Sequence, residues 1–185
     1  GKKLDVVSAF EAWGQKVSGK ISDEDYDNVI SKSCHGPGAC GGMYTANTMA
    51  SAIEAMGLAL PYNSSNPAIS NDKSQEKNII ANSITNLLEK DIKPSDILNK
   101  KAIENAVRLI TVLGGSTNAV LHILAICKTA NIDFDLNDFQ KISNETPFLA
   151  DLKPSGKHLM EDLHNVGGVP AVLKFMLDND MLHPD

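Results

Sequence analysis

The segment from Cys34 to Met49 constrains the fold of this chain more than any other part of the sequence. It places four glycines and a proline within residues 36–42, and such a run cannot continue a helix. From Thr45 onward the side chains are mostly small and helical in pattern, and Gly57 is a natural C-terminal stop. The sequence therefore predicts a glycine-rich turn, containing Cys40, that leads directly into a helix.

Cys40 is the residue of this turn that can carry chemistry. Free N–H groups and the helix dipole near a helix N-terminus favour a thiolate, which is the form that binds a soft metal. The residues alone leave three interpretations open: a metal ligand, an inert buried cysteine, and a disulfide or shared metal site with Cys34. The spacing between Cys34 and Cys40 matches no common zinc motif.

Hydrophobic periodicity and capping residues predict a mostly helical chain. The expected helices cover residues 4–17, 22–33, 45–56, 70–89, 95–98, 102–113, 117–126, 135–142, 158–165 and a last one from 170. Ser22, Ser70 and Asp135 are the expected N-caps of three of them. One stripe, at Ile79, Ile80, Ile84, Leu87 and Leu88, is expected to face the core. In the helix after Thr117, the residues expected to be buried are Val120, Leu121, Leu124, Ala125 and Ile126, with His122 as a packed core histidine. Residues 147–152 are the best strand candidate.

A second glycine-rich junction lies at residues 114–118. Gly114-Gly115 ends one helix, and Ser116 or Thr117 caps the next. Two hydroxyls, the Asn118 amide and free N–H groups at a helix N-terminus suit a carboxylate ligand. Ser116, Thr117 and Asn118 are therefore candidate substrate-binding residues. An ordinary capped connection between two helices is the alternative.

Five segments of the chain carry a resemblance that covers essentially its whole length. They are Val6–Ala12, Ala39–Ala50, Gly114–His122, Lys153–Lys157 and Met160–Gly168. In this order they are similar to segments of the dihydroxy-acid/phosphogluconate dehydratase family. The family more often reads Cys-Pro-Gly-Ala-Gly where this chain reads Cys34-His35-Gly36-Pro37-Gly38. That departure leaves the family's cluster cysteine unaffected, because it matches Cys40 and not Cys34.

The resemblance implies a hydro-lyase that converts a 2,3-dihydroxy carboxylic acid to a 2-keto acid. Family members hold an iron–sulfur cluster with three cysteines, commonly [2Fe–2S], with [4Fe–4S] as the alternative, and Cys40 matches the third cysteine. The family's Cys-Asp-Lys motif, which serves Mg²⁺, and its Asp-Gly-Arg-x-Ser motif, which holds the catalytic serine, do not occur here. The resemblance thus places one cluster ligand, no catalytic residue and no Mg²⁺ ligand in this chain, which alone is expected to be inactive.

The resemblance also indicates which member of the family this is. Cys40–Asn47 resembles the dihydroxy-acid type that serves branched-chain amino-acid (valine, isoleucine) synthesis. A sugar-acid dehydratase of the same family is the first alternative, and a non-catalytic helical interaction domain is the second. The implied fold is a predominantly α-helical fragment of the family's α/β N-terminal domain, with few short strands. Residues 1–185 would form a single partial domain of a longer enzyme that is typically a homodimer.

Composition excludes several other classes. Hydrophobic residues make up 42% and charged residues 22% of the chain, as in ordinary globular proteins. A net charge of −6 argues against nucleic acid and anionic membranes as partners. The sequence contains no apolar run of membrane-spanning length and no signal-peptide core. With three cysteines, a secreted disulfide scaffold is not indicated, so the cytoplasm or an organelle matrix is expected.

One other group of side chains invites a metal interpretation. On a helix, His158, Glu161 and Asp162 share a face, and His164 lies four residues after Met160. The group is neither a His-Glu-x-x-His motif nor a repeated Glu-x-x-His motif, so a zinc peptidase and a di-iron bundle are unsupported. A structural role is the favoured interpretation.

Overall fold

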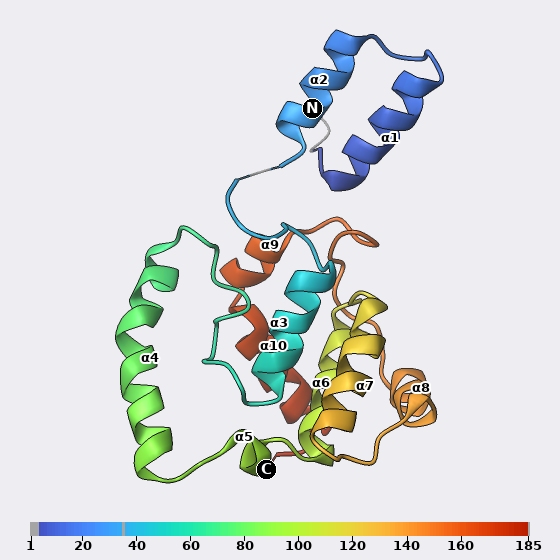
Figure 1. The fold of residues 1–185 in the computed structure, drawn as a ribbon. Helices are drawn as coiled ribbons and strands as arrows, with labels where there is room; N and C mark the ends of the chain where they lie inside the picture. The colour runs from blue at the N-terminus through green and yellow to red at the C-terminus, as the bar shows by residue number, and fades with distance from the viewer. Residues whose placement is uncertain (1–3, 35, 185) are drawn as a thin grey trace. The chain divides into compact units, whose positions relative to one another are not determined.

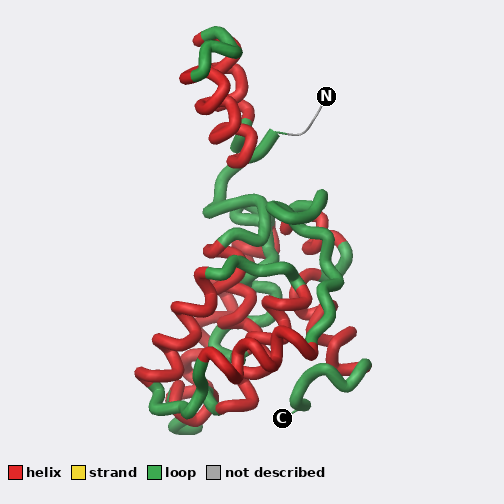
Figure 2. Tube along the Cα trace, turned by 90° about the vertical axis from the view of Figure 1, so that its right-hand side faces the viewer, coloured by secondary structure: helices red, strands yellow, loops and turns green. Residues whose placement is uncertain are grey.

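The structure is a computed structural model that describes residues 4–34 and 36–184. Over these residues it contains ten α-helices and no sheet (Figures 1 and 2). The chain divides into two compact units, Gly1–Gly41 and Gly42–Asp185, which are described here one at a time. The predominantly helical fold class is confirmed. Within the described ranges, no helix is long and apolar enough to cross a membrane.

The first unit is a pair of helices, α1 (Val6–Val17) and α2 (Asp23–Lys32). Asp5 caps α1 by accepting from the Ser8 N–H at 2.9 Å, and Ser22 caps α2 as the sequence predicts. The two helices are joined by an aromatic contact between Trp13 and Tyr26, whose ring centroids are 5.8 Å apart. These short-range contacts account for a helical hairpin with little buried apolar surface of its own.

The second unit holds the remaining helices. They are α3 (Thr45–Ala55), α4 (Asn71–Glu89), α5 (Pro94–Ile97), α6 (Lys100–Val112), α7 (Asn118–Thr129), α8 (Leu136–Glu145), α9 (Met160–Asn165) and α10 (Gly168–Asp178). Helix α6 lies at the centre, because α3 and α8 both pack against it and α7 packs against α3 and α8. The predicted caps Ser70 and Asp135 are both confirmed at α4 and α8.

Two groups of buried apolar side chains fill this unit. The first lies among α3, α6, α7 and α8 and consists of Ala52, Met56, Ile103, Ala106, Val107, Ile110, Ala119, Ile123, Cys127, Phe134 and Ile142. The second joins α6 to the C-terminal helices and consists of Met43, Leu109, Val112, Leu113, Leu152, Met160, Val169 and Met176. One face of α6 contributes to the first group and a different face contributes to the second, so this helix connects the two halves of the core.

The predicted strand at residues 147–152 is wrong. The backbone N–H groups of Leu149 and Ala150 both donate to the Val112 carbonyl at the end of α6, at 3.1 and 3.0 Å. Leu152 forms only an isolated bridge with His158. The backbone of the segment is bonded to the end of α6, and the described residues offer it no neighbouring strand.

The apolar stripe of α4 does not face the core. Ile79 and Ile84 are about half exposed, and Leu88 is 75% exposed. The buried residue of this helix is Glu76, which hydrogen-bonds to the loop before α4. Helix α4 is therefore held at its N-terminal half through polar contacts, and periodicity alone predicted the wrong face.

The buried face of α7 also differs from the predicted one. Ala119, Ile123 and Cys127 are buried, whereas Leu121 is 70% exposed and His122 is exposed. Because apolar residues surround most of this helix, periodicity could not decide which side packs against α3. The small, buried side chains of Ala119 and Cys127 allow the helices to approach closely.

Candidate functional site

In the glycine-rich turn, Cys40 lies two residues before the buried Gly42. None of the three cysteines is in a disulfide; Cys34 is exposed and Cys40 is half-buried. At Gly42 an added Cβ would lie 2.8 Å from the Lys153 carbonyl oxygen, so only glycine fits there. The space that a side chain at Gly42 would need is filled by Lys153 of the same chain.

The start of α3 holds the Gly42–Met43 peptide in place. The Asn47 side-chain amide donates to the Gly42 carbonyl at 2.6 Å, and the Met43 N–H donates to the Lys153 carbonyl at 2.6 Å. The Met43 side chain is fully buried. The backbone that follows Cys40 is thus anchored by a first-turn side chain of α3 and by the turn at Lys153.

The described residues contain no complete metal site. No group of three or more His, Cys, Asp and Glu side chains lies close enough to hold an ion. The group of His158, Glu161, Asp162 and His164 near α9 does not form a metal site. Asp162 caps the helix by accepting from the Leu159 N–H at 2.8 Å, and its carboxylate lies 3.8 Å from Nδ1 of His158. His164 lies 3.9 Å from Asp72 instead. Cys40 could therefore serve only as one ligand of a group completed by residues elsewhere.

The structure brings the predicted junction residues against the start of α3. The Thr45 and Ser116 hydroxyls are 3.1 Å apart, and the Asn118 amide donates to the Thr45 hydroxyl at 2.9 Å. The Ser116 N–H donates to the buried Thr48 hydroxyl at 3.0 Å. Two helix N-termini, those of α3 and α7, therefore lie side by side although their sequences are far apart.

The three predicted residues have different surroundings at this junction. Ser116 is half-buried and its hydroxyl accepts from the Asn118 N–H at 3.3 Å, so it takes part in capping α7. Thr117 occupies the N-cap position, is exposed, and makes no capping hydrogen bond with its side chain. A hydroxyl and backbone N–H groups at the start of a helix are suited to bind a carboxylate. Thr117 is the member of the three whose side chain is open to a ligand.

A close approach of α3 explains the glycine before this junction. An added Cβ at Gly115 would lie 2.8 Å from the Thr48 methyl carbon and 3.1 Å from the Ile110 carbonyl oxygen. A larger residue would push α3 away from α7. Gly42 and Gly115 therefore both permit close packing at the N-terminal end of α3, Gly42 against Lys153 and Gly115 against Thr48.

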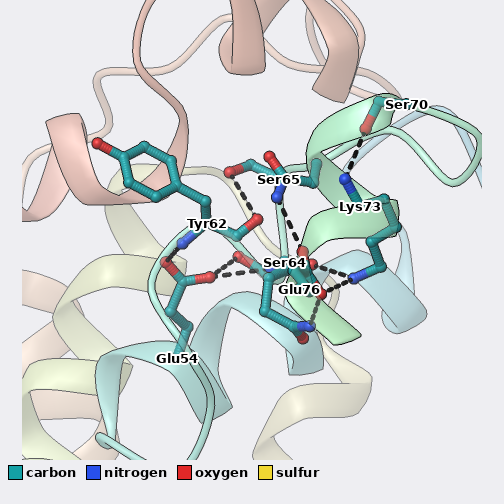
Figure 3. A network of polar contacts seen from close by, with 9 residues as sticks. Glu54, Tyr62, Ser64, Ser65, Ser70, Lys73 and Glu76 are labelled. Atoms are coloured by element: carbon teal, nitrogen blue, oxygen red, sulfur yellow. Dashed lines mark hydrogen bonds and ion pairs between the residues drawn. The ribbon is translucent and has the colours of Figure 1, made fainter. Parts of the chain in front are cut away.

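Sequence reasoning missed a buried polar network between α3 and α4 (Figure 3). Glu54 accepts from the Tyr62 and Ser64 N–H groups at 2.8 and 2.9 Å, and from the Ser64 hydroxyl at 2.6 Å. Glu76 accepts from Asn63 at 2.6 Å, among other donors. The loop before α4 thus turns the side chains of Asn63, Ser64 and Asn66 inward. The signal in the sequence was Glu54, an acidic residue on a helix of otherwise small, polar uncharged or apolar side chains.

The pKa of Glu76 reflects this environment. Burial, the largest single influence, raises it, but hydrogen bonds from Asn66, Lys73 and Asn63 and the charge of Lys73 outweigh burial. The pKa of the carboxyl is therefore lowered from its ordinary value. Glu76 is a charged anchor for the loop and not a proton donor at neutral pH.

Comparison with known proteins gives the family. The model for the N-terminal region of dihydroxy-acid/6-phosphogluconate dehydratases matches residues 1–185. The chain is 62% identical over its whole length to a dihydroxy-acid dehydratase of Flavobacterium psychrophilum, covering 33% of that protein. It is 60% identical to that of Lactococcus lactis subsp. cremoris and 56% identical to that of Francisella tularensis subsp. novicida, covering 32% and 33% of them.

These matches cover the whole chain, and the predominantly helical fold agrees with them. It belongs to the dihydroxy-acid/6-phosphogluconate dehydratase family. The chain spans about a third of the length of the curated relatives it matches.

Proposed function

We propose that this chain is part of an enzyme that removes water from a 2,3-dihydroxy carboxylic acid and produces the 2-keto acid. The observation that carries the proposal is identity of 55–62% over the whole chain to relatives named dihydroxy-acid dehydratase. The Cys40 motif supports the same assignment. Branched-chain amino-acid biosynthesis, a homodimer and a cytoplasmic or organelle-matrix location belong to this proposal, and the chain alone is expected to be inactive.

Cys40 would supply one thiolate to an iron–sulfur cluster, [2Fe–2S] or [4Fe–4S]. Its half-burial and the anchored backbone behind it are compatible with a ligand shared with residues outside this chain. When bound, a cluster with an open iron position and a Mg²⁺ ion supply Lewis acidity for loss of the C3 hydroxyl. In this proposal the Mg²⁺ ligands and the catalytic base also lie outside the chain.

The junction of α3 and α7 would bind the substrate's carboxylate. Thr117 offers its exposed hydroxyl, while Ser116 and Asn118 hold the two helix starts together through Thr45. The dipole of α7 favours an anion at this place. The role proposed for the junction is to orient the acid and not to move a proton.

The test uses the full-length protein that contains this chain, purified without oxygen. We expect the wild type to contain iron and sulfide with a visible cluster spectrum, and Cys40→Ala to lose both. Cys34→Ala is the matched control and should keep the cluster. A wild type without cluster after reconstitution, or an intact cluster in Cys40→Ala, would contradict the ligand assignment and favour a non-catalytic interaction domain.

Substrate preference separates the members of the family. We expect turnover of 2,3-dihydroxy-isovalerate and little turnover of sugar acids; the reverse order would identify a sugar-acid dehydratase. Thr117→Val should raise KM, because the hydroxyl proposed to bind the carboxylate is removed. The melting temperature should not change, because the Thr117 side chain is exposed and its replacement removes no buried contact. Unchanged kinetics in Thr117→Val would remove the junction from the substrate site.

A further inference from the structure

The Thr48 hydroxyl joins α3 to the loop that precedes α7. It donates to the Tyr44 carbonyl at 2.7 Å, one turn back along the chain, and accepts from the Ser116 N–H at 3.0 Å. The Thr48 side chain is fully buried. The hydroxyl therefore uses both its donor and an acceptor position inside the protein, and its bond to Ser116 connects residues 68 positions apart.

The loop before α7 is held from two sides. On one side, the Gly114 N–H donates to the Thr111 carbonyl at 3.1 Å and the Gly115 N–H donates to the Ile110 carbonyl at 2.8 Å, both near the end of α6. On the other side lies Thr48, whose methyl carbon would be 2.8 Å from a Cβ added at Gly115. The backbone that leads into α7 is thus enclosed between α6 and the Thr48 side chain.

The hydrogen bonds of this loop leave one residue open. Thr48 accepts from the Ser116 N–H, and the Ser116 hydroxyl accepts from the Asn118 N–H at 3.3 Å. Between them, the Thr117 N–H donates to no acceptor among the described residues, and the Thr117 hydroxyl makes no capping hydrogen bond. Because Thr117 is exposed, its N–H and its hydroxyl can both donate to a carboxylate.

We propose that Thr48 is a positioning residue for the substrate's carboxylate, acting through Ser116 on Thr117. This inference rests on the proposed function, which gives Thr117 the contact with the substrate. By accepting from the Ser116 N–H, Thr48 fixes the peptide group one residue before Thr117. A binding group that is displaced by about 1 Å loses much of its effect. Thr48 itself is buried and touches no ligand in this proposal.

The discriminating substitution is Thr48→Val in the full-length protein. Valine keeps the shape of threonine but offers no acceptor to the Ser116 N–H. We expect KM for 2,3-dihydroxy-isovalerate to rise about tenfold while kcat stays within about twofold, because a contact made equally in the ground and transition states is weakened. Thr48→Ser keeps the hydroxyl and should restore most of the affinity. Thr48→Ala takes the place of Thr48→Val if that variant does not fold.

Thr146→Val is the matched control. Thr146 is also buried, and its hydroxyl donates to the Ile142 carbonyl at 2.7 Å, four residues back, as that of Thr48 does to Tyr44. The control therefore removes the same kind of hydrogen bond and leaves the bond between Thr48 and Ser116 in place. We expect its KM to equal that of the wild type even where its melting temperature falls. An equal rise of KM in Thr146→Val and Thr48→Val would overturn the positioning role.

A double variant tests whether Thr48 acts through Thr117. If it does, Thr117→Val already removes the contact that Thr48 positions, and adding Thr48→Val should raise KM little further. Effects on KM that multiply in the double variant would show that the two residues act independently and would overturn the proposed route.

The outcomes also separate this inference from the proposed function. If Thr117→Val raises KM and Thr48→Val does not, the positioning role is wrong and the carboxylate site stands. If neither substitution raises KM, or if the protein turns over no 2,3-dihydroxy acid, both are overturned.

Discussion

Ser64 donates two hydrogen bonds to the same oxygen of Glu54, one from its backbone N–H at 2.9 Å and one from its hydroxyl at 2.6 Å. The other oxygen of Glu54 accepts from the Tyr62 N–H at 2.8 Å. The Glu54 side chain is 7% exposed, so its charge is compensated by the loop and not by water. This carboxylate therefore shapes the connection between α3 and α4.

Glu54→Gln is expected to destabilise the protein by about 1–3 kcal/mol, because one amide nitrogen would face donors that need an acceptor. The measurement is the free energy of unfolding from urea titration. Glu89→Gln, at the exposed end of α4, makes the same chemical change and should cost less than about 0.5 kcal/mol. Equal effects of the two substitutions would show that the loop does not depend on the buried carboxylate.

Glu76 should make stability depend on pH in the acidic range. Its pKa in the folded protein is lower than the ordinary value of 4.5, so the unfolded chain takes up this proton first as the pH falls. The stabilisation is therefore complete above pH 4.5 and is lost as the pH falls through the folded-state pKa. The melting-temperature difference between wild type and Glu76→Gln should shrink in that range. A difference that stays constant with pH would contradict the assignment.

The buried face of α7 can be tested with two substitutions on one helix. Ile123→Ala should cost about 2–5 kcal/mol, since Ile123 is fully buried. Leu121→Ala should change the free energy of unfolding by less than about 0.5 kcal/mol, since Leu121 is 70% exposed. The reverse order, measured by urea titration, would restore the face that periodicity alone indicated.

The three thiols should differ in their reaction with a disulfide reagent. Cys34 is exposed and should react first, whereas burial removes Cys127 from solvent and raises its pKa, so that little thiolate is present. We expect Cys34→Ser to remove the fastest phase and Cys127→Ser to remove a phase seen only in denaturant. Rapid modification of Cys127 in the folded protein would show that α7 is not packed as described.

Local signals in the sequence predicted the helices well. Ser22, Ser70 and Asp135 cap helices as expected, because a capping side chain bonds a backbone N–H only two or three residues away. Gly57 and Gly114 follow helix ends with positive φ, which glycine adopts easily. Where the local signal was only apolar character, as in residues 147–152, the prediction of a strand failed.

The candidate site was predictable in part. Cys40, Ser116, Thr117 and Asn118 were selected from motifs and a family resemblance. The contact of Ser116 and Asn118 with Thr45 joins residues more than seventy positions apart, and no spacing rule anticipates it. The hydrogen bond from Asn47 to the Gly42 carbonyl joins residues that are close in sequence. The second hydrogen bond of the same peptide, from the Met43 N–H to the Lys153 carbonyl, joins distant parts of the chain and could not be predicted from spacing.

The sequence by itself determined where helices begin and end and where the backbone had to be glycine, because those choices depend on atoms within one turn of one another. Only the tertiary structure decided which sides of α4 and α7 are buried, and that Glu54 and Glu76 lie inside. Burial depends on which neighbour a face meets, and a carboxylate can leave water only where several donors converge on it. That convergence is set by the packing of α3, α4 and their connecting loop, which no local pattern of residues encodes.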